Sequence, residues 1–262
     1  MLVKGKKLAY QVIDNRKYEQ KLANENATLY DEIITREWGY RYRYVTAYSW
    51  GRSFDEPFLD LGCGTGMCSS VLESLNKEVI ALDISREMIK IAKKRCKNVY
   101  FVVGDALNLP FRNEVFSTIC IIGVLHHILD LEKIFDEIFR CTRQIVCINE
   151  PISNPSPFIK FPLILIYGLA RIPAAFINLL RKRVPKSYHS KYERSLNGNN
   201  LIRLCEERGL KVVDIRYYTH IPFLNFFLSD RIRGRICKAL SSLKRGTEIQ
   251  IIAIRKTSIL KS

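Results

Sequence analysis

Three closely spaced glycines form the pattern in this chain that is best suited to binding a ligand. Gly62, Gly64 and Gly66 follow the apolar run Phe58–Leu61 and precede a stretch with the apolar spacing of a helix. Glycine reaches positive φ and lets a ligand approach the backbone, while the following helix offers free N–H groups to a carboxylate or phosphate. Met67 stands where the dinucleotide fingerprint Gly-x-Gly-x-x-Gly needs glycine, so the spacing favours a different Gly-rich Rossmann-like group.

Two adjacent histidines are the main candidates for proton transfer. His126 and His127 follow the apolar run Thr118–Ile122, and imidazole titrates near neutral pH. One of them could be a general base; the alternative is that they cap the next helix or pack beneath a ligand. Glu150, after a later apolar run, is expected to bind a polar substrate group or to pair with an arginine.

Alternating elements are needed to bring these residues together. Short apolar runs alternate with amphipathic stretches, which predicts βαβ units and a parallel sheet. Right-handed crossovers place the loops that follow the strands along one edge, where ligands bind. The expected strands are 58–61, 78–83, 99–103, 118–122, 144–148, 212–218 and 248–255, and the expected helices are 67–75, 86–96, 131–141 and 199–207, the last with Gly209 as its C-cap.

Four ordered motifs resemble the class I S-adenosylmethionine-dependent methyltransferases, and most closely the type 11 small-molecule group that includes quinone-biosynthesis enzymes. The motifs are residues 58–66, Leu82-Asp83-Ile84-Ser85, residues 104–111 and residues 124–128. The resemblance implies an α/β fold: a Rossmann-like, seven-stranded, mostly parallel sheet with an antiparallel last strand and a helical apolar lid insertion. It also implies S-adenosylmethionine as the cofactor and methyl transfer as the reaction.

The resemblance assigns most of the motif residues to the cofactor. Asp83 would accept both ribose hydroxyl protons, Asp105 would bind the adenine amino group, and Ile84 would pack on the ring. Taken alone, Asp83 or Asp105 could instead cap a helix. The full set implied for the cofactor is Asp60, Gly62, Cys63, Gly64, Gly66, Asp83, Ile84, Met88, Asp105 and Ala106, with His126 and His127 as the catalytic candidates and no metal site.

Composition limits the class of protein. The 262 residues are 47% hydrophobic, enough for one α/β domain with accessory elements. The eight cysteines form no Cys-x-x-Cys pair and lie mostly among apolar residues, which indicates buried thiols in a reducing compartment. The first residues lack the apolar region of a secretory signal, so we expect a cytoplasmic protein.

Four regions follow from these patterns. We expect an N-terminal helical cap at 1–57, whose Tyr30 and Trp38 either close the site or pack in the core. The S-adenosylmethionine-binding core spans 58–151. An apolar and basic lid insertion spans 152–197, and residues 198–262 complete the α/β core with a second basic insertion at 221–246.

The last third of the chain carries nearly all of the net charge of +16. Residues 151–262 hold 21 Lys and Arg against 6 Asp and Glu, which points to an anionic partner for that part. The apolar stretch 158–180 is interrupted by charges and prolines, so it is too short for the ~20 residues of a membrane span. Two interpretations remain: a simple lid, or peripheral contact with an anionic inner membrane face through 157–183 and 221–238.

An apolar lid predicts a small-molecule or lipid-linked methyl acceptor, such as a quinone, isoprenoid or glycolipid precursor. An RNA (tRNA) methyltransferase is the first alternative, which is less expected because the cationic residues are interleaved with aliphatic stretches rather than gathered for a nucleic acid. A non-catalytic S-adenosylmethionine-binding module is the second alternative. The acceptor, the methylated atom and the oligomeric state stay open.

Overall fold

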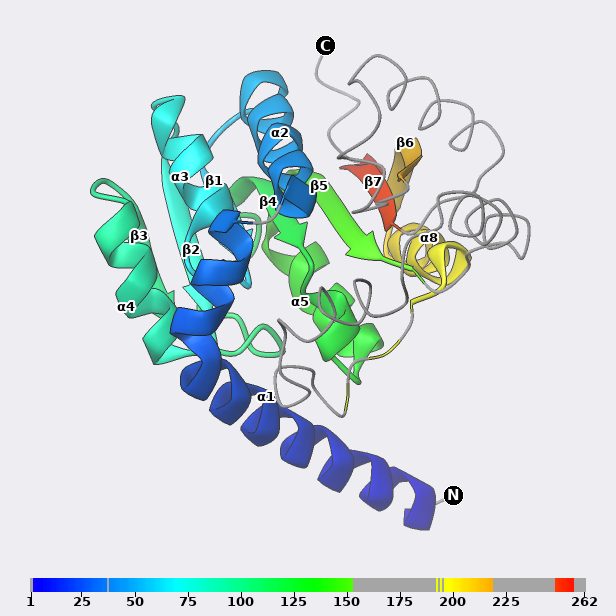
Figure 1. Ribbon diagram of the computed structural model, residues 1–262. Helices are drawn as coiled ribbons and strands as arrows, with labels where there is room; N and C mark the ends of the chain where they lie inside the picture. The colour runs from blue at the N-terminus through cyan, green and yellow to red at the C-terminus, as the bar shows by residue number, and fades with distance from the viewer. Residues whose placement is uncertain are drawn as a thin grey trace, which may run out of the picture.

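A central sheet of seven strands organises the chain. The structure is a computed structural model that describes residues 2–36, 38–152, 192, 194, 196–218 and 248–256. Within these residues the strand order is β3-β2-β1-β4-β5-β7-β6 (Figure 1). The strands are β1 (Phe58–Leu61), β2 (Val79–Asp83), β3 (Tyr100–Val103), β4 (Phe116–Ile122), β5 (Thr142–Pro151), β6 (Leu210–Tyr218) and β7 (Glu248–Arg255).

The direction of the strands places several loops at one edge. β1 pairs in parallel with β2 and β4, β2 pairs in parallel with β3, and β4 pairs in parallel with β5. β7 runs antiparallel to both β5 and β6. The mostly parallel Rossmann-like sheet with an antiparallel last strand is therefore confirmed. The carboxyl ends of β1, β2, β4 and β5 share one edge, which is where this class of sheet binds ligands.

Helices cover both faces of the sheet. Buried residues of α2 and α3 pack with Phe58 and Val79 on one face, and Ile89 of α4 packs with Ala81 on the same face. Buried residues of α5 and α8 pack with Ile119 and Ile121 on the other. The described helices are α1 (Leu2–Arg36), α2 (Trp38–Ser53), α3 (Met67–Ser74), α4 (Arg86–Arg95), the 3₁₀ turn η1 (Leu125–His127), α5 (Leu131–Cys141) and α8 (Gly198–Glu207).

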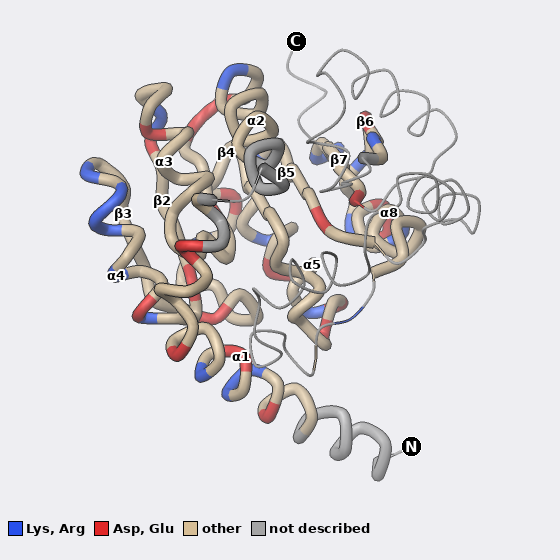
Figure 2. Tube along the Cα trace, in the orientation of Figure 1, with Lys and Arg blue, Asp and Glu red and all other residues tan. Residues whose placement is uncertain are grey.

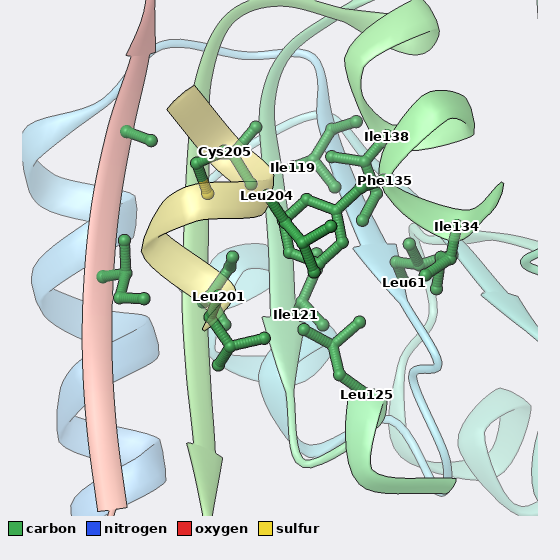
Figure 3. Packing of buried hydrophobic residues seen from close by; sticks show 14 of the residues in the cluster. Leu61, Ile119, Ile121, Leu125, Ile134, Phe135, Ile138, Leu201, Leu204 and Cys205 are labelled. Atoms are coloured by element: carbon green, nitrogen blue, oxygen red, sulfur yellow. The ribbon is translucent and has the colours of Figure 1, made fainter. Parts of the chain in front are cut away.

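Helix α5 shows why these sequences form these elements. Its buried side chains Leu131, Ile134, Phe135 and Ile138 recur at helical spacing, and the Asp130 side chain caps its N-terminus by accepting the Lys133 N–H. Figure 3 shows Phe135 within the cluster, among side chains from β4 and α8. Burying a side chain of this size stabilises the fold by about 1.5–3 kcal/mol.

The predicted N-terminal helices are confirmed, because α1 and α2 together cover nearly all of residues 2–53. The expected helix 199–207 is also confirmed, and Gly209 follows its end with φ +81°. The lid stretch 158–180 and the insertion 221–246 lie outside the described residues. Among the helices that are described, none is long and apolar enough to cross a bilayer.

Glu248 gives the sheet a stability that depends on pH. Its side chain is buried beside the end of β5, its Oε2 has no hydrogen-bond partner among the described residues, and burial raises its pKa to about 8. The folded state therefore keeps a proton that the unfolded chain loses above its ordinary pKa of 4.5. Stability must fall as the pH rises through this window, by up to about 1.4 kcal/mol per pH unit.

We predict that Glu248→Gln removes this dependence, because the amide cannot ionise. Relative to the parent, the variant gains stability as the pH rises from about 5 to about 8.5, as measured by urea unfolding. Glu206→Gln is the control, because Glu206 lies exposed on α8. An offset between Glu248→Gln and the parent that stays the same at every pH would contradict the prediction.

Candidate active site

The glycine turn after β1 adopts a backbone that only glycine accepts easily. Gly62, Gly64 and Gly66 all have positive φ, between +52° and +82°. A Cβ at position 62 would lie 2.4 Å from a methyl carbon of Val124, and one at position 66 would lie 2.9 Å from the Cβ of Ala92. Gly62 and Gly66 therefore let the turn pack closely against two other elements.

Asp83, at the end of β2, fixes the turn from the side. Its Oδ2 accepts the Gly64 N–H at 2.8 Å, and its Oδ1 accepts the Ser85 N–H at 2.8 Å. Burial raises the pKa of Asp83, while these N–H donors act in the opposite direction. Ser85, not Asp83, is the N-cap of α4, because its Oγ accepts the Met88 N–H. The helix-cap alternative for Asp83 is therefore wrong.

A cavity of about 380 Å³ opens at this edge of the sheet, a size typical of small-molecule sites. It brings together residues from the ends of β1, β2, β3, β4 and β5 with residues of α1. Nine of the twelve residues predicted for the site line it: Gly62, Gly64, Asp83, Ile84, Met88, Asp105, Ala106, His126 and His127.

The other three predicted residues, Asp60, Cys63 and Gly66, are not among those that line this cavity. Asp60 is buried and accepts a hydrogen bond of 2.5 Å from Ser69 Oγ at the start of α3; burial raises its pKa to about 6. The Cys63 side chain is also buried, and burial raises the pKa of its thiol. These residues support the turn from the protein side.

Of the α1 residues at the cavity, sequence reasoning expected only Tyr30 and missed the others. Asn15, Arg16, Glu19, Asn26 and Tyr30 all line the cavity from this helix. Figure 1 shows α1 running along the sheet, and Figure 2 shows charges of both signs on its middle part. The spacing of these cavity-lining residues could have predicted them, because positions 15, 19, 26 and 30 share one helical face. Trp38 belongs to α2, but its side chain lies outside the described residues.

Several contacts tie α1 to the edge of the sheet. Arg16 forms an ion pair with Asp105 at 2.7 Å, and Gln20 donates a hydrogen bond to the Ile84 carbonyl. Further along the helix, the Asn24 side chain accepts the Ser85 hydroxyl proton at 2.7 Å. The helix therefore contacts the loops after β2 and β3, the loops to which the resemblance assigns adenosine binding.

Both histidines stand beside a carboxylate. His126 Nδ1 lies 2.9 Å from Glu150 Oε2, and His127 Nδ1 lies 3.2 Å from Glu19 Oε2. The two rings are stacked at a tilt, with centroids 4.0 Å apart. Glu150 is fully buried, and its Oε1 also accepts the N–H groups of Val124 and Leu125. Glu150 thus holds the 3₁₀ turn η1 in place, a role that the sequence did not suggest.

Comparisons with known proteins agree with this architecture. Residues 59–145, about a third of the chain, match a family model described as "Methyltransferase domain". A demethylmenaquinone methyltransferase from Paenarthrobacter aurescens is 29% identical over 143 residues, which cover 49% of this chain and 55% of that protein. The norajmaline N-methyltransferase of Rauvolfia serpentina is 32% identical over 105 residues, or 37% of this chain and 36% of that one. The match spans about half the length of the first relative and less of the second.

A solved structure extends the likeness over most of the fold. Magnesium protoporphyrin IX methyltransferase from Synechocystis, with bound S-adenosylmethionine, superposes with a TM-score of 0.62 at 10% identity and covers 92% of this chain and 97% of its own. At this identity the likeness concerns the fold. Residues 59–145 are therefore similar in sequence to a methyltransferase domain, and the chain shares the fold of the class I methyltransferases.

The close packing at Gly66 predicts a stability effect. Gly66→Ala should destabilise the protein by about 1–3 kcal/mol, because the new Cβ must hold φ +82° and also press on Ala92 of α4. Gly209→Ala is the matched control, since Gly209 has φ +81° but its Cβ would meet only ordinary contacts with Phe139. Chemical unfolding measures both variants, and equal losses of stability would show that the contact with Ala92 adds nothing.

Proposed function

We propose that the methyltransferase domain of residues 59–145, with α1 over its cavity, binds S-adenosylmethionine and methylates a small-molecule or lipid-linked acceptor of the quinone type. The observation that carries the proposal is the convergence of nine predicted residues on one cavity at the carboxyl edge of the sheet. When bound, the cofactor supplies a methyl group already activated by its positive sulfur.

The cavity fits the adenosine part of this cofactor. Gly64 has no side chain on the cavity wall, where a Cβ would stand only 3.5 Å from the Tyr30 ring. Asp83 keeps lone pairs for two hydroxyl groups, since each of its oxygens accepts one N–H in the structure. Ile84, Met88 and Ala106 supply apolar surface around it. In this proposal Asp83 binds the ribose and Asp105 binds the adenine edge.

The residues of this chain then do two things for the reaction. The walls orient the reactants and exclude water, which lowers the barrier for a displacement at a single carbon atom. The histidines provide a base for an acceptor that must lose a proton, as a hydroxyl of a reduced quinone does. Both histidines line the cavity, but His126 is buried against Glu150 whereas the His127 side chain is 37% exposed, so His127 is the better placed base.

The acceptor class is supported by the relatives and by the sequence. Several similar proteins are named demethylmenaquinone methyltransferase, among them one from Thermotoga maritima that is 35% identical over 91 residues, which cover 34% of this chain and 40% of that protein. The norajmaline enzyme shows that similar domains also serve other small molecules. The apolar stretch 158–180, which follows β5 at the cavity edge, suits an apolar acceptor.

Cofactor binding is tested most directly at Asp83 and Gly64. We expect Asp83→Ala and Gly64→Arg each to abolish S-adenosylmethionine binding in calorimetry, the first by removing the ribose ligand and the second by filling the cavity. Circular dichroism checks that both variants stay folded. Glu87→Gln is the control, because its carboxylate pairs with Lys90 on the surface of α4. Unchanged affinity in both folded variants would refute the proposed cofactor site.

We further propose that the protein works at the cytoplasmic face of a membrane, where a lipid-linked acceptor would reside. The support is the basic cluster Arg181-Lys182-Arg183 beside the apolar stretch 158–180, and the basic charge repeated in 221–238. All of these residues lie outside the described part of the structure. Contact with lipid would need no membrane-spanning segment.

Charge reversal tests the membrane proposal. Replacing Arg181, Lys182 and Arg183 with glutamate should weaken cosedimentation with vesicles of anionic lipid, since each basic residue near the surface contributes about 1 kcal/mol. The same replacement at Lys93, Lys94 and Lys97, which are exposed at or just beyond the end of α4, controls for net charge alone. No binding of the parent protein to anionic vesicles would reject the proposal.

A further inference from the structure

The two histidines of η1 stand beside carboxylates that differ in surroundings, and the contact of His126 is a hydrogen bond whereas that of His127 is an ion-pair distance. Glu150 is fully buried on β5 and is bound by three groups, the His126 ring and two backbone N–H groups. Glu19 belongs to α1, its side chain is 15% exposed, and its Oε2 stands 3.2 Å from His127 Nδ1. The first pair lies within the core of the domain, whereas the second joins the domain to the N-terminal helix.

A carboxylate beside Nδ1 determines what the rest of the imidazole can do. When Nδ1 carries the proton and faces the carboxylate, Nε2 is left as the nitrogen that accepts a proton. The carboxylate also stabilises the imidazolium once it has formed. Within the part of the chain that the structure describes, the groups that bear on His127 include Glu19 from α1, Asp83 from β2, the tilted His126 ring and, behind it, Glu150.

The contact between Glu19 and His127 depends on the position of α1. The Asn15 side chain donates a hydrogen bond to the His127 carbonyl, one turn of helix before Glu19. Arg16 reaches Asp105 at the other end of the cavity, and Asp31 pairs with Arg95 of α4 at 2.5 Å. Glu19 can therefore meet His127 only when α1 lies across the cavity.

We propose that Glu19 is a positioning residue that holds His127 through Nδ1 and so presents Nε2 as the proton acceptor only when α1 covers the cofactor cavity. The inference rests on the proposed methyltransferase function. The acceptor's electron pair forms the bond to the methyl carbon, the pair of the broken carbon–sulfur bond stays on sulfur, and the acceptor's proton moves to Nε2. From there it passes to water, which reaches the partly exposed His127 side chain.

Two substitutions at Glu19 separate charge from orientation. Glu19→Gln keeps an oxygen for Nδ1–H but removes the charge that favours the imidazolium, so the acid limb of the kcat profile should move about one pH unit lower. Glu19→Ala removes both and should lower kcat at least about tenfold at all pH values, since a general base contributes 10²–10⁴-fold. The KM for S-adenosylmethionine should stay within about twofold, because Glu19 acts through His127. The acceptor probe is a short-chain demethylated naphthoquinol with labelled methyl donor.

Histidine NMR provides a readout that needs no turnover. The chain has four histidines, so labelled imidazole signals are few, and the His127 signal is the one that His127→Gln removes. In the cofactor-free protein, Glu19→Gln should lower the titration midpoint of His127. Full-length protein is used throughout.

Two variants on α1 serve as controls. Glu25→Gln changes an exposed acid that pairs with Lys21, and it should change neither the titration nor the pH profile. Asp31→Asn weakens the anchoring of α1 to α4 without touching a histidine, so it reports what loosening the helix does by itself. If the contact between Glu19 and His127 only held α1 in place, the Glu19 variants would behave like Asp31→Asn.

The outcomes are distinct. A lower His127 midpoint in Glu19→Gln, together with the shifted kcat limb and no added effect of Glu19→Ala in a His127→Gln background, supports the inference. If the parent is active but Glu19→Gln changes neither the titration midpoint of His127 nor the pH profile of kcat, the inference is overturned and the proposed function is not. A parent that neither binds S-adenosylmethionine nor methylates any acceptor overturns the proposed function and this inference together.

Discussion

The carboxylate of Asp83 is the constraint on which the geometry of the cavity depends. Burial raises its pKa and so disfavours its charge, yet it accepts an N–H from the glycine turn and another from the start of α4. A charge-assisted hydrogen bond is stronger than a neutral one, which offsets part of the cost of burying the carboxylate. One carboxyl group thus links two loops through hydrogen bonds, and the same group lines the cavity.

Helix α1 forms the part of the cavity wall that the loops at the sheet edge do not form. Its Arg16 pairs with Asp105 and its Glu19 lies beside His127, and these two partners belong to loops after different strands. Such partly exposed ion pairs contribute little to stability, about 0–1 kcal/mol each. Their effect is on geometry: they set the position of a helix that is joined to the domain through one other helix. Small changes in these pairs can therefore alter access to the cavity at little cost in folding free energy.

The sequence predicted the sheet well because local patterns determine it. The last strand, Glu248–Arg255, and the helix Leu131–Cys141 have the predicted bounds, since alternating and helical apolar spacing are visible within one segment. β5 begins two residues earlier than predicted, at Thr142, which pairs with Phe116 of β4. It ends three residues later, at Pro151, which pairs with Glu248 of β7. The β7 partner lies about 100 positions away, so no local pattern shows this pairing.

The candidate site was predictable only in part, for the same reason. The glycines and acids of the turn stand in recognisable motifs, whereas Glu19 and His127 are 108 positions apart and belong to different elements. The resemblance assigned Asp60 to the cofactor together with the glycine turn. In the structure Asp60 accepts a hydrogen bond from Ser69 and is not among the residues that line the cavity.

The topology also indicates which segments of the chain select the acceptor in the proposed function. β5 ends at Pro151, which lines the cavity, and in the register of the sheet Pro151 pairs with Glu248, the first residue of β7. Tyr218, the last residue of β6, pairs with Glu248 as well. The basic and apolar stretches 153–191 and 219–247 are therefore attached at the cavity edge. In the proposed function, the loops that line the cavity bind the cofactor, and the segments attached beside them select the acceptor.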